Sequence, residues 1–330
     1  MRRSGIEKIP YFKIALIGIA VIFFLCIGFL FLKTWEDSMG IFPGQEMESN
    51  VIEHEGVAYI LKENIETFLV LGLDKFDGQT GVDSYNNDKQ ADFLMLFVFD
   101  HAAKQYTAIH INRDTMVDVS VLGVAGNKID TAYKQIALSH TYGNGREMSC
   151  HNTAESVSSL LMGTRVNHYA SVTMDSVAVI NDLVGGVEVK VLDDFTGIDD
   201  SLVKGETITL KGNQALTYVR TRKDLEDSSN STRMNRQQQY INALYQAFNR
   251  CVEKDSEFIV EVSMKMSEYM ISDRSVTQLQ ALAEKFREYE FLGIKTIEGE
   301  SVLGKEFIEF YPSETALKEM IINLFYKPKK

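Results

Sequence analysis

An uncharged apolar run, Ile14 to Leu32 (IALIGIAVIFFLCIGFLFL), constrains this 330-residue chain more than any other feature. The run is long enough to cross the hydrocarbon core of a bilayer as one helix. It lacks the polar face that a helix on a soluble protein would show. A cleavable signal peptide is the alternative, but its apolar region usually has roughly 7–15 residues and ends at an A-x-A-like site. We therefore predict a retained transmembrane anchor over residues 14–32.

The charges around this run predict its orientation. Residues 1–13 carry Arg2, Arg3, Lys8 and Lys13 against the single acid Glu7. The positive-inside rule places such a tail in the cytoplasm and the rest of the chain outside the cell membrane. Residues 33–66 are mixed and polar, which is typical of a stalk with room for a short helix near its end.

The net charge limits the partners of the exported part. The whole chain carries a formal charge of −12, although its first residues are basic. Nonspecific attraction to nucleic acid is therefore excluded as the main activity, and a DNA-binding regulator would in addition require a cytoplasmic domain.

From Thr67 the pattern becomes that of a folded domain. TFLVLGL (67–73) and DFLMLFVF (92–99) are short apolar runs typical of strands buried on both faces, and QYTAIHI (105–111) alternates. Later segments alternate between strand and helix patterns, and nothing after residue 67 resembles a linker. We predict one three-layer α-β-α domain with a central mixed sheet over residues 67–330.

Four arginines lie close together in the sequence: Arg220, Arg222, Arg233 and Arg236. If YVRTR (218–222) is a strand, the first two share one face. The other two are three residues apart on one face of the following helix, near its N-terminus. Such an arrangement can bind phosphate oxygens. The alternative is that these arginines neutralise neighbouring surface acids.

Two acidic residues flank the first two predicted strands. Asp74 ends the first strand and Asp92 begins the next, so the carboxylates converge if the strands are adjacent and antiparallel. Two carboxylates can hold Mg²⁺, which completes its shell with water and phosphate oxygens. Acids that only cap turns are the alternative. Arg113 and Asp114 leave the end of the third strand, at an edge where α/β proteins usually bind ligands.

Seven stretches, in this order, resemble the LytR-CpsA-Psr family of membrane-anchored cell-wall phosphotransferases. They are FLVLGLDK, QADFLMLFV, INRDTMV, GNKIDTAYKQIALSHTYGNG, MDSVAVINDLVGGVEVKV, LKGNQALTYVRTRK and RMNRQQQ. The ordered set covers residues 67 to about 248 and is more specific than any one motif. The resemblance agrees with a basic tail, one anchor and an exported α/β domain.

The resemblance implies transfer of a glycopolymer phosphate from a polyprenyl pyrophosphate carrier to a hydroxyl of peptidoglycan. It implies Mg²⁺ on the pyrophosphate and an apolar tunnel for the lipid. Carried over by motif, Asp74 and Asp92 are the metal-side acids. The catalytic pyrophosphate clamp comprises Arg113, Arg220, Arg222 and Arg233, and the further substrate-binding candidates are Arg236, Gln237 and Gln90. For the tunnel, the candidate faces are 155–162, 177–184 and 240–248.

Three residues depart from the family pattern. Gln90 stands where an arginine is common, Asn112 where a proline is common, and Asn230 where an acid is common. A second function is therefore open, namely a catalytically silent protein that binds lipid pyrophosphate or glycan and acts in envelope assembly or regulation. Asp227 is a candidate replacement for the missing acid. Cys150 and Cys251 form either a disulfide or two separate thiols.

Overall fold

The computed structural model describes residues 51–74, 89–222, 225, 227, 229–255, 257–286 and 289–329. The predicted cytoplasmic tail, the anchor at 14–32 and the stalk up to residue 50 lie outside the described residues. Within the described ranges, no helix has the length and apolar character needed to cross a membrane.

A six-stranded mixed sheet forms the centre of the domain, in the order β11-β8-β3-β4-β5-β12. β3 pairs antiparallel with β4, and β4 pairs antiparallel with β5, whereas β8 and β12 join the sheet by parallel pairing with β3 and β5. The bounds are β3 Ile65–Leu73, β4 Ala91–Asp100, β5 Gln105–Ile111, β8 His168–Thr173, β11 Met270–Ser272 and β12 Glu290–Thr296. The predicted adjacency of the first two strands is confirmed.

The two central strands are apolar on both faces because each face is covered by its own core. Side chains alternate along a strand, so Phe68 and Val70 of β3 enter one core while Leu69, Leu71 and Leu73 enter the other. This burial on both sides explains why the strands lack the polar alternation of a half-exposed sheet.

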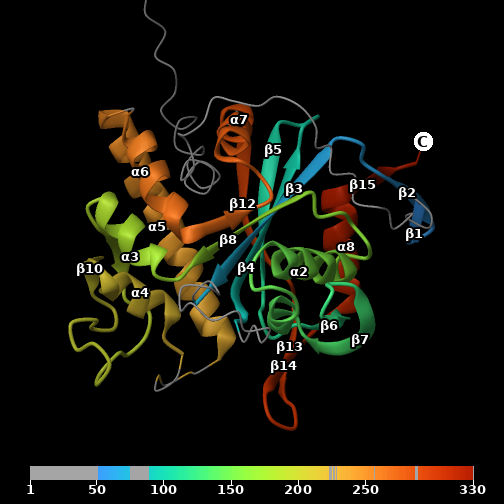
Figure 1. Cartoon of the computed structure of the whole chain (residues 1–330), viewed down its shortest axis with the longest axis horizontal. Helices are drawn as coiled ribbons and strands as arrows, with labels where there is room; N and C mark the ends of the chain where they lie inside the picture. Colours follow the sequence, from blue (N-terminus) through green and yellow to red (C-terminus); the bar gives the residue numbers. More distant parts are fainter. Residues whose placement is uncertain are drawn as a thin grey trace, which may run out of the picture.

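Helices cover both faces of the sheet (Figure 1), which gives the predicted three layers. One layer contains α3 Ser176–Leu183, α4 Asn213–Arg220, α5 Asn230–Lys254, α6 Phe258–Met266 and α7 Val276–Phe286. The opposite layer contains α2 Glu147–Leu160, the 3-10 helix η2 Ile136–Thr141 and α8 Glu314–Phe325.

Smaller two-stranded units surround this framework. They are β6 Met116–Leu122 with β7 Lys128–Gln135, β9 Val187–Lys190 with β10 Thr207–Leu210, and β13 Gly299–Leu303 with β14 Ile308–Pro312. A one-turn 3-10 helix, η3 Ser267–Tyr269, joins α6 to β11.

The end of the predicted stalk is folded as strand. β1 (Val51–His54) and β2 (Val57–Leu61) form a three-stranded sheet with β15 (Tyr326–Pro328) near the C-terminus, and β3 already begins at Ile65. The short helix suggested near residue 64 is therefore wrong. Backbone pairing with a distant partner stabilises strand in a segment whose own sequence has no strong periodicity.

The two cysteines of the described domain are separate thiols. Cys150 is buried on α2 in the core beneath one face, whereas Cys251 on α5 packs against the core of the other face. The sheet lies between them, so the disulfide alternative is excluded.

Candidate functional site

A β-bulge brings two acids to one end of the sheet. Gly72 pairs with Phe93 and Leu73 pairs with Ala91, so Asp92 is an extra residue on β4 without a partner on β3. Such bulges re-aim a side chain and are frequent beside binding sites. Asp74 follows Leu73 directly, and both carboxylates therefore leave the β3–β4 pair at the same end.

Arg113 meets one of these acids just beyond the end of β5. Its guanidinium donates hydrogen bonds to the Asp92 carboxylate and to the side-chain oxygen of Gln90. Arg113 Nε also lies 3.6 Å from Asp114 Oδ1. Gln90 thus orients Arg113 in this structure, while the bulged Asp92 pairs with it.

Arg220 and Arg222 come from the end of a helix, not from a strand. Arg220 is the last residue of α4, and Thr221 is its C-cap. The strand considered for 218–222 is wrong, because Ala215, Tyr218 and Val219 pack into the core at helical spacing. The two arginines still converge on the acids, with Arg220 Nη2 2.9 Å from Asp74 Oδ2 and Arg222 Nη1 3.7 Å from Asp114 Oδ2.

Arg233 lies in the first turn of α5, where the helix dipole favours anions. Ser229 caps this helix by accepting a hydrogen bond from the Thr232 N–H. Burial lowers the pKa of Arg233 to about 10, an effect that the Asp92 carboxylate opposes and that Arg113 and Arg222 reinforce. Arg233 therefore stays charged at neutral pH but is poorly neutralised by the protein.

Two of the sequence-predicted residues are buried and hydrogen-bonded to main-chain carbonyl oxygens. Arg236 is fully buried, and its guanidinium donates to the carbonyl oxygens of Tyr218 and Thr221 and to the Asp193 carboxylate. This buried arginine holds the end of α4 and the residue that follows it. Gln237 is also buried and donates to the Val219 carbonyl oxygen at 3.2 Å, but its side chain lines the apolar cavity described below.

The structure thus brings seven charged side chains together, which we call the polar cluster. Its members are Asp74, Asp92, Arg113, Asp114, Arg220, Arg222 and Arg233. Among the described residues, four buried atoms of the cluster have no hydrogen-bond partner, namely Asp74 Oδ1, Arg113 Nε, Asp114 Oδ2 and Arg233 Nε. Unpaired buried polar atoms are costly and are concentrated at functional sites.

Asp114 was assigned no role by motif, and the structure makes it the most deeply buried acid of the cluster. Burial raises its pKa, and the charges of Arg113, Arg222 and Arg233 offset only part of that effect. A carboxylate with a raised pKa is a better proton acceptor than an exposed one. Its position after Arg113 at the end of a buried strand was the available sequence signal.

Asp227 does not replace the missing acid at position 230. Hydrogen bonds from the Thr232 hydroxyl and the Ser229 N–H lower its pKa, and the side chain is exposed. It supports the start of α5. Asn230 itself is buried and links Arg233 to Asn112.

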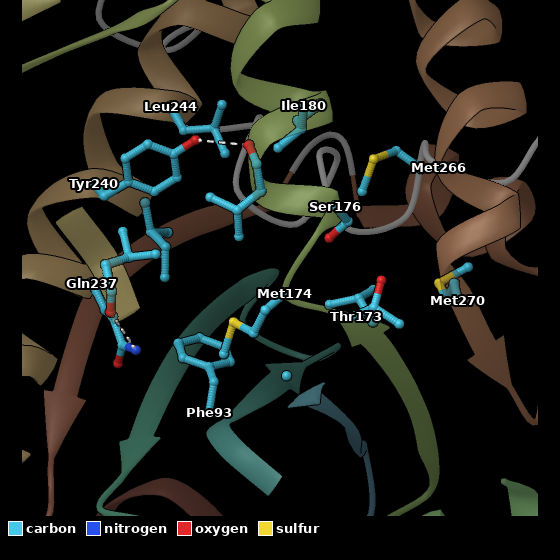
Figure 2. Close-up of a pocket in the computed structure, with 15 residues that line it drawn as sticks. Phe93, Thr173, Met174, Ser176, Ile180, Gln237, Tyr240, Leu244, Met266 and Met270 are labelled. Carbon is cyan, nitrogen blue, oxygen red and sulfur yellow. Dashed lines mark hydrogen bonds between the residues drawn. The ribbon is translucent and has the colours of Figure 1, made fainter. Parts of the chain in front are cut away.

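An apolar cavity of about 110 Å³ lies next to the polar cluster, between the sheet and α3, α5 and α6. Figure 2 shows Tyr240 and Leu244 of α5 on one side, Ile180 of α3 above, and Met266 and Met270 on the other side. Phe93 and Gln237 lie at one end of this view. Phe93 directly follows Asp92, and Val219, which also lines the cavity, directly precedes Arg220. Residues of the cavity wall and residues of the polar cluster are therefore direct neighbours in the chain.

Two of the three faces proposed for a tunnel line this cavity, those at 177–184 and 240–248. The third, 155–162, packs on the opposite face of the sheet and is wrong. Met266 and Met270, beyond the region of strongest resemblance, were missed because apolar residues look the same in a cavity wall and in a core.

The donor set of the cluster suits a hard divalent cation. Oxygen ligands are what Mg²⁺ prefers, and it commonly takes only one or two protein carboxylates. Asp74 and Asp92 supply such carboxylates, and Asp74 Oδ1 is buried without a hydrogen-bond partner. No cluster of three or more His, Cys, Asp or Glu side chains suited to a metal occurs within the described ranges. The residues present therefore fit Mg²⁺ shared with a phosphate ligand, not a closed structural metal site.

Comparison with known proteins gives a family match and several relatives. A family model described as "LytR_cpsA_psr family" matches residues 43–324. Two relatives are each named polyisoprenyl-teichoic acid–peptidoglycan teichoic acid transferase TagU. The one from Bacillus licheniformis is 28% identical over 245 residues, covering 74% of this chain and 71% of the relative. The one from Enterococcus faecalis is 26% identical over 274 residues, covering 82% and 81%.

Solved structures share the fold. A structure titled "TagT bound to LIIa-WTA" aligns with a TM-score of 0.58 at 21% identity, covering 79% of this chain and 90% of that one. Another, "Crystal structure of B. subtilis TagV", aligns with a TM-score of 0.56 at 24% identity, covering 80% and 97%.

Proposed function

This chain belongs to the LytR_cpsA_psr family, and from that premise we propose that it is a transferase attaching a glycopolymer to peptidoglycan outside the cell membrane. The donor in this proposal is a polyprenyl pyrophosphate that carries the polymer. The observation on which it depends is that an apolar cavity and a cluster of guanidinium and carboxylate groups are built from adjacent residues, since Phe93 follows Asp92 and Val219 precedes Arg220. A lipid with a diphosphate head group has the same two parts.

The cavity supports the lipid half of the donor. Among the described residues that line it, Thr173, Ser176 and Gln237 are uncharged polar residues, Tyr240 carries a hydroxyl, and the others are apolar. A polyprenyl chain gains free energy by leaving water for such a surface. We place the first isoprene units, next to the diphosphate, inside the cavity.

The arginines support the diphosphate half. Arg113, Arg220, Arg222 and Arg233 supply guanidinium groups, which bind phosphate oxygens in bidentate geometry. Arg233 contributes most where water is excluded, because it is buried and only partly neutralised by acids. Charge neutralisation and positioning are the main requirements of phosphoryl transfer.

We assign Asp74 and Asp92 to Mg²⁺. A bound Mg²⁺ would neutralise charge that develops on the diphosphate oxygens. Asp92 also pairs with Arg113, so one carboxylate links the proposed metal site to the guanidinium clamp.

In the proposed reaction the acceptor hydroxyl oxygen forms a bond to the phosphorus that carries the glycopolymer. The bond from that phosphorus to the bridging oxygen breaks, and polyprenyl phosphate leaves. The hydroxyl proton must be accepted, and we assign this role to Asp114 because burial raises its pKa beside Arg113. The arginines stabilise the charge that develops during transfer.

The predicted anchor completes the proposal. A retained helix at 14–32 would hold the domain at the membrane from which a lipid-linked donor is presented. We place the protein in the cell membrane with a single span and a cytoplasmic N-terminus.

The test uses the full chain in detergent with MgCl₂, a short polyprenyl-pyrophosphate-linked oligosaccharide and peptidoglycan. We expect release of polyprenyl phosphate and label on the peptidoglycan. Arg113→Ala should lower turnover by at least about 100-fold, the usual loss when one donor to a developing charge is removed. Arg146→Ala is a matched control, since this arginine is half exposed at the start of α2.

The silent-binder alternative predicts a different result. Tight binding of the pyrophosphate by the wild type, with no polyprenyl phosphate released over hours, would refute the transferase. Turnover that survives Arg113→Ala would refute the assigned site.

A further inference from the structure

Two hairpins pack together beside the polar cluster, on the side away from the apolar cavity. The β13–β14 hairpin projects from one end of the domain, and the β6–β7 hairpin lies beside its base (Figure 1). Thr115, just before β6, forms a bridge with Phe310 of β14. Gln135 at the end of β7 donates to the Ile308 carbonyl oxygen at 2.7 Å, which fastens one hairpin to the other.

The same glutamine connects the hairpins to the cluster. Gln135 Nε2 lies 3.2 Å from Asp114 Oδ1. The Phe310 N–H donates to the Asp114 carbonyl oxygen at 2.9 Å. Side chains two residues apart on a strand share a face, so Tyr133 follows Gln135 on the face of β7 that leads away from the site.

Two exposed tyrosines stand on this surface. Tyr133 is 57% exposed and Tyr311 is 38% exposed, although aromatic side chains are usually more buried. Tyr311 donates a hydrogen bond of 2.6 Å to Glu309. Partial burial, with the charges of Asp118 and Glu309, raises the pKa of Tyr133, while the Glu309 hydrogen bond raises the pKa of Tyr311. Glu309 therefore lies near both phenols, and Asp118 pairs across the hairpin with Tyr133.

We propose that Asp118, Tyr133, Glu309 and Tyr311 form a ledge that binds the acceptor glycan strand next to the transfer site. Aromatic faces pack against the apolar faces of sugar rings, and the carboxylates accept hydrogen bonds from sugar hydroxyls. The ledge is continuous with the proposed site through Gln135 and Asp114. This inference rests on the proposed function for the identity of the acceptor.

Charge discriminates between the two substrates. A polymer rich in phosphate would be repelled by Asp118 and Glu309, whereas a glycan chain offers hydroxyl donors to them. The lipid of the donor has its own apolar cavity on the other side of the cluster. Donor and acceptor would thus approach the cluster from different sides, which an in-line displacement requires.

The direct test is glycan binding to the full chain in detergent, without donor and without Mg²⁺. The probe is a soluble, uncross-linked peptidoglycan glycan strand, and the method is isothermal titration calorimetry. We expect Tyr133→Ala with Tyr311→Ala to weaken binding about tenfold or more, from the loss of two aromatic contacts. The double Tyr→Phe variant keeps both rings and should stay within about threefold of wild type.

Controls separate the ledge from other surfaces. Tyr269→Ala removes a tyrosine of η3, on the cavity side of the sheet, and should leave glycan binding unchanged. A soluble polyphosphate should not compete for the ledge. Circular dichroism checks that the exposed substitutions leave the fold intact.

The outcomes distinguish this inference from the proposed function. Three results would overturn the ledge, whether or not the enzyme turns over. They are glycan binding that the double alanine variant retains, absence of glycan binding by the wild type, and competition by polyphosphate. If the chain shows no turnover but binds the glycan, and the double variant loses this binding, the ledge is supported and the transferase is refuted. In an active enzyme, the double variant should raise the acceptor KM with little change in donor binding.

Discussion

Asn230 and Asn112 meet beneath the arginines, where Asn230 Nδ2 donates a hydrogen bond of 2.6 Å to Asn112 Oδ1. Both residues depart from the pattern of the family that the sequence resembles, which has an acid and a proline at these positions. Both are buried, and Asn112 Oδ1 also accepts from the Asp114 N–H at 3.0 Å. The two departures are thus one interaction that fixes the start of the Arg113–Asp114 segment against α5.

We predict that Asn230→Asp is destabilising alone and tolerated with Asn112→Ala. A carboxylate at position 230 would face Asn112 Oδ1, an acceptor that cannot rotate away without losing the Asp114 N–H. A double-mutant cycle in urea unfolding should give a coupling of about 0.5–3 kcal/mol, the range for residues in contact. Additive effects of the two substitutions would contradict the relationship.

The central strands could be predicted from the sequence, because burial on both faces makes their apolar runs continuous. The end of α4 could not be assigned with the same rule. YVRTR is rich in residues that favour strands, but Ala215, Tyr218 and Val219 pack at helical spacing into the core. Tertiary packing overrode local propensity there, and the spacing in the preceding residues was the signal that could have corrected it.

The convergence of the arginines and acids was predicted from the sequence, but the difference in burial among the arginines was not. Four arginines near residue 228 look equivalent in sequence, yet Arg236 is fully buried and Arg220 is half exposed. Their roles depend on carbonyl oxygens of Tyr218 and Thr221, which no sequence pattern displays. The cavity wall was predicted only partly for the same reason, since which face of the sheet a helix covers depends on topology.

Substitution of Arg236 should lower the free energy of unfolding much more than substitution of Arg220. Arg236→Met leaves Asp193 and two carbonyl oxygens without their partner, so the free energy of unfolding should fall by about 3–5 kcal/mol, as when one partner of a buried ion pair is removed. Arg220→Ala should change it by less than about 1 kcal/mol, because its ion pair with Asp74 is largely exposed. Urea unfolding measures both, and equal losses would contradict the assignment.

The proposed metal site predicts a change in Mg²⁺ dependence. Chelation by EDTA should abolish transfer, and Asp74→Asn should raise the Mg²⁺ concentration for half-maximal activity by about tenfold or more, since one of few protein ligands loses its charge. Glu188→Gln, on the exposed face of β9, is the control and should show the wild-type Mg²⁺ curve. A wild-type curve for Asp74→Asn would exclude this residue as a ligand.

The thiols should differ in reactivity. Burial raises the pKa of Cys150 to about 12, so its thiolate is scarce at pH 8 and its sulfur is covered. Cys251 is partly exposed on α5. Titration of the native chain with a thiol reagent, with Cys26 replaced by Ala, should therefore label Cys251 well before Cys150. Reductant should leave the melting temperature unchanged, and a lower melting temperature would contradict two free thiols.

A charged network at the other end of the sheet predicts how stability depends on pH. Burial alone would raise the pKa of Glu66, but hydrogen bonds from His168, Lys285 and His101 lower it to about 2. Burial alone would lower the pKa of His168, but Asp273 and Glu66 raise it, against the charge of Arg274. These contacts link the end of β11 and the end of α7 to the start of β3 and β8.

The sign of each effect follows from linkage. Stabilisation by Glu66 is complete above its unfolded value of 4.5 and is lost as the pH falls toward 2. Stabilisation by His168 is complete below its unfolded value of 6.5 and is lost as the pH rises through its folded pKa. The network should therefore contribute most between pH 4.5 and 6.5.

Glu66→Gln tests the acid side of this window. At pH 6 the variant should lose about 3 kcal/mol of unfolding free energy, from the size of the lowered pKa, and at pH 2 the difference from wild type should be small. Glu290→Gln, an exposed carboxylate that accepts from Gln105, is the matched control and should change little at either pH. Urea unfolding over this range provides the measurement. A loss that is the same at both pH values would mean that Glu66 acts through packing and not through its charge.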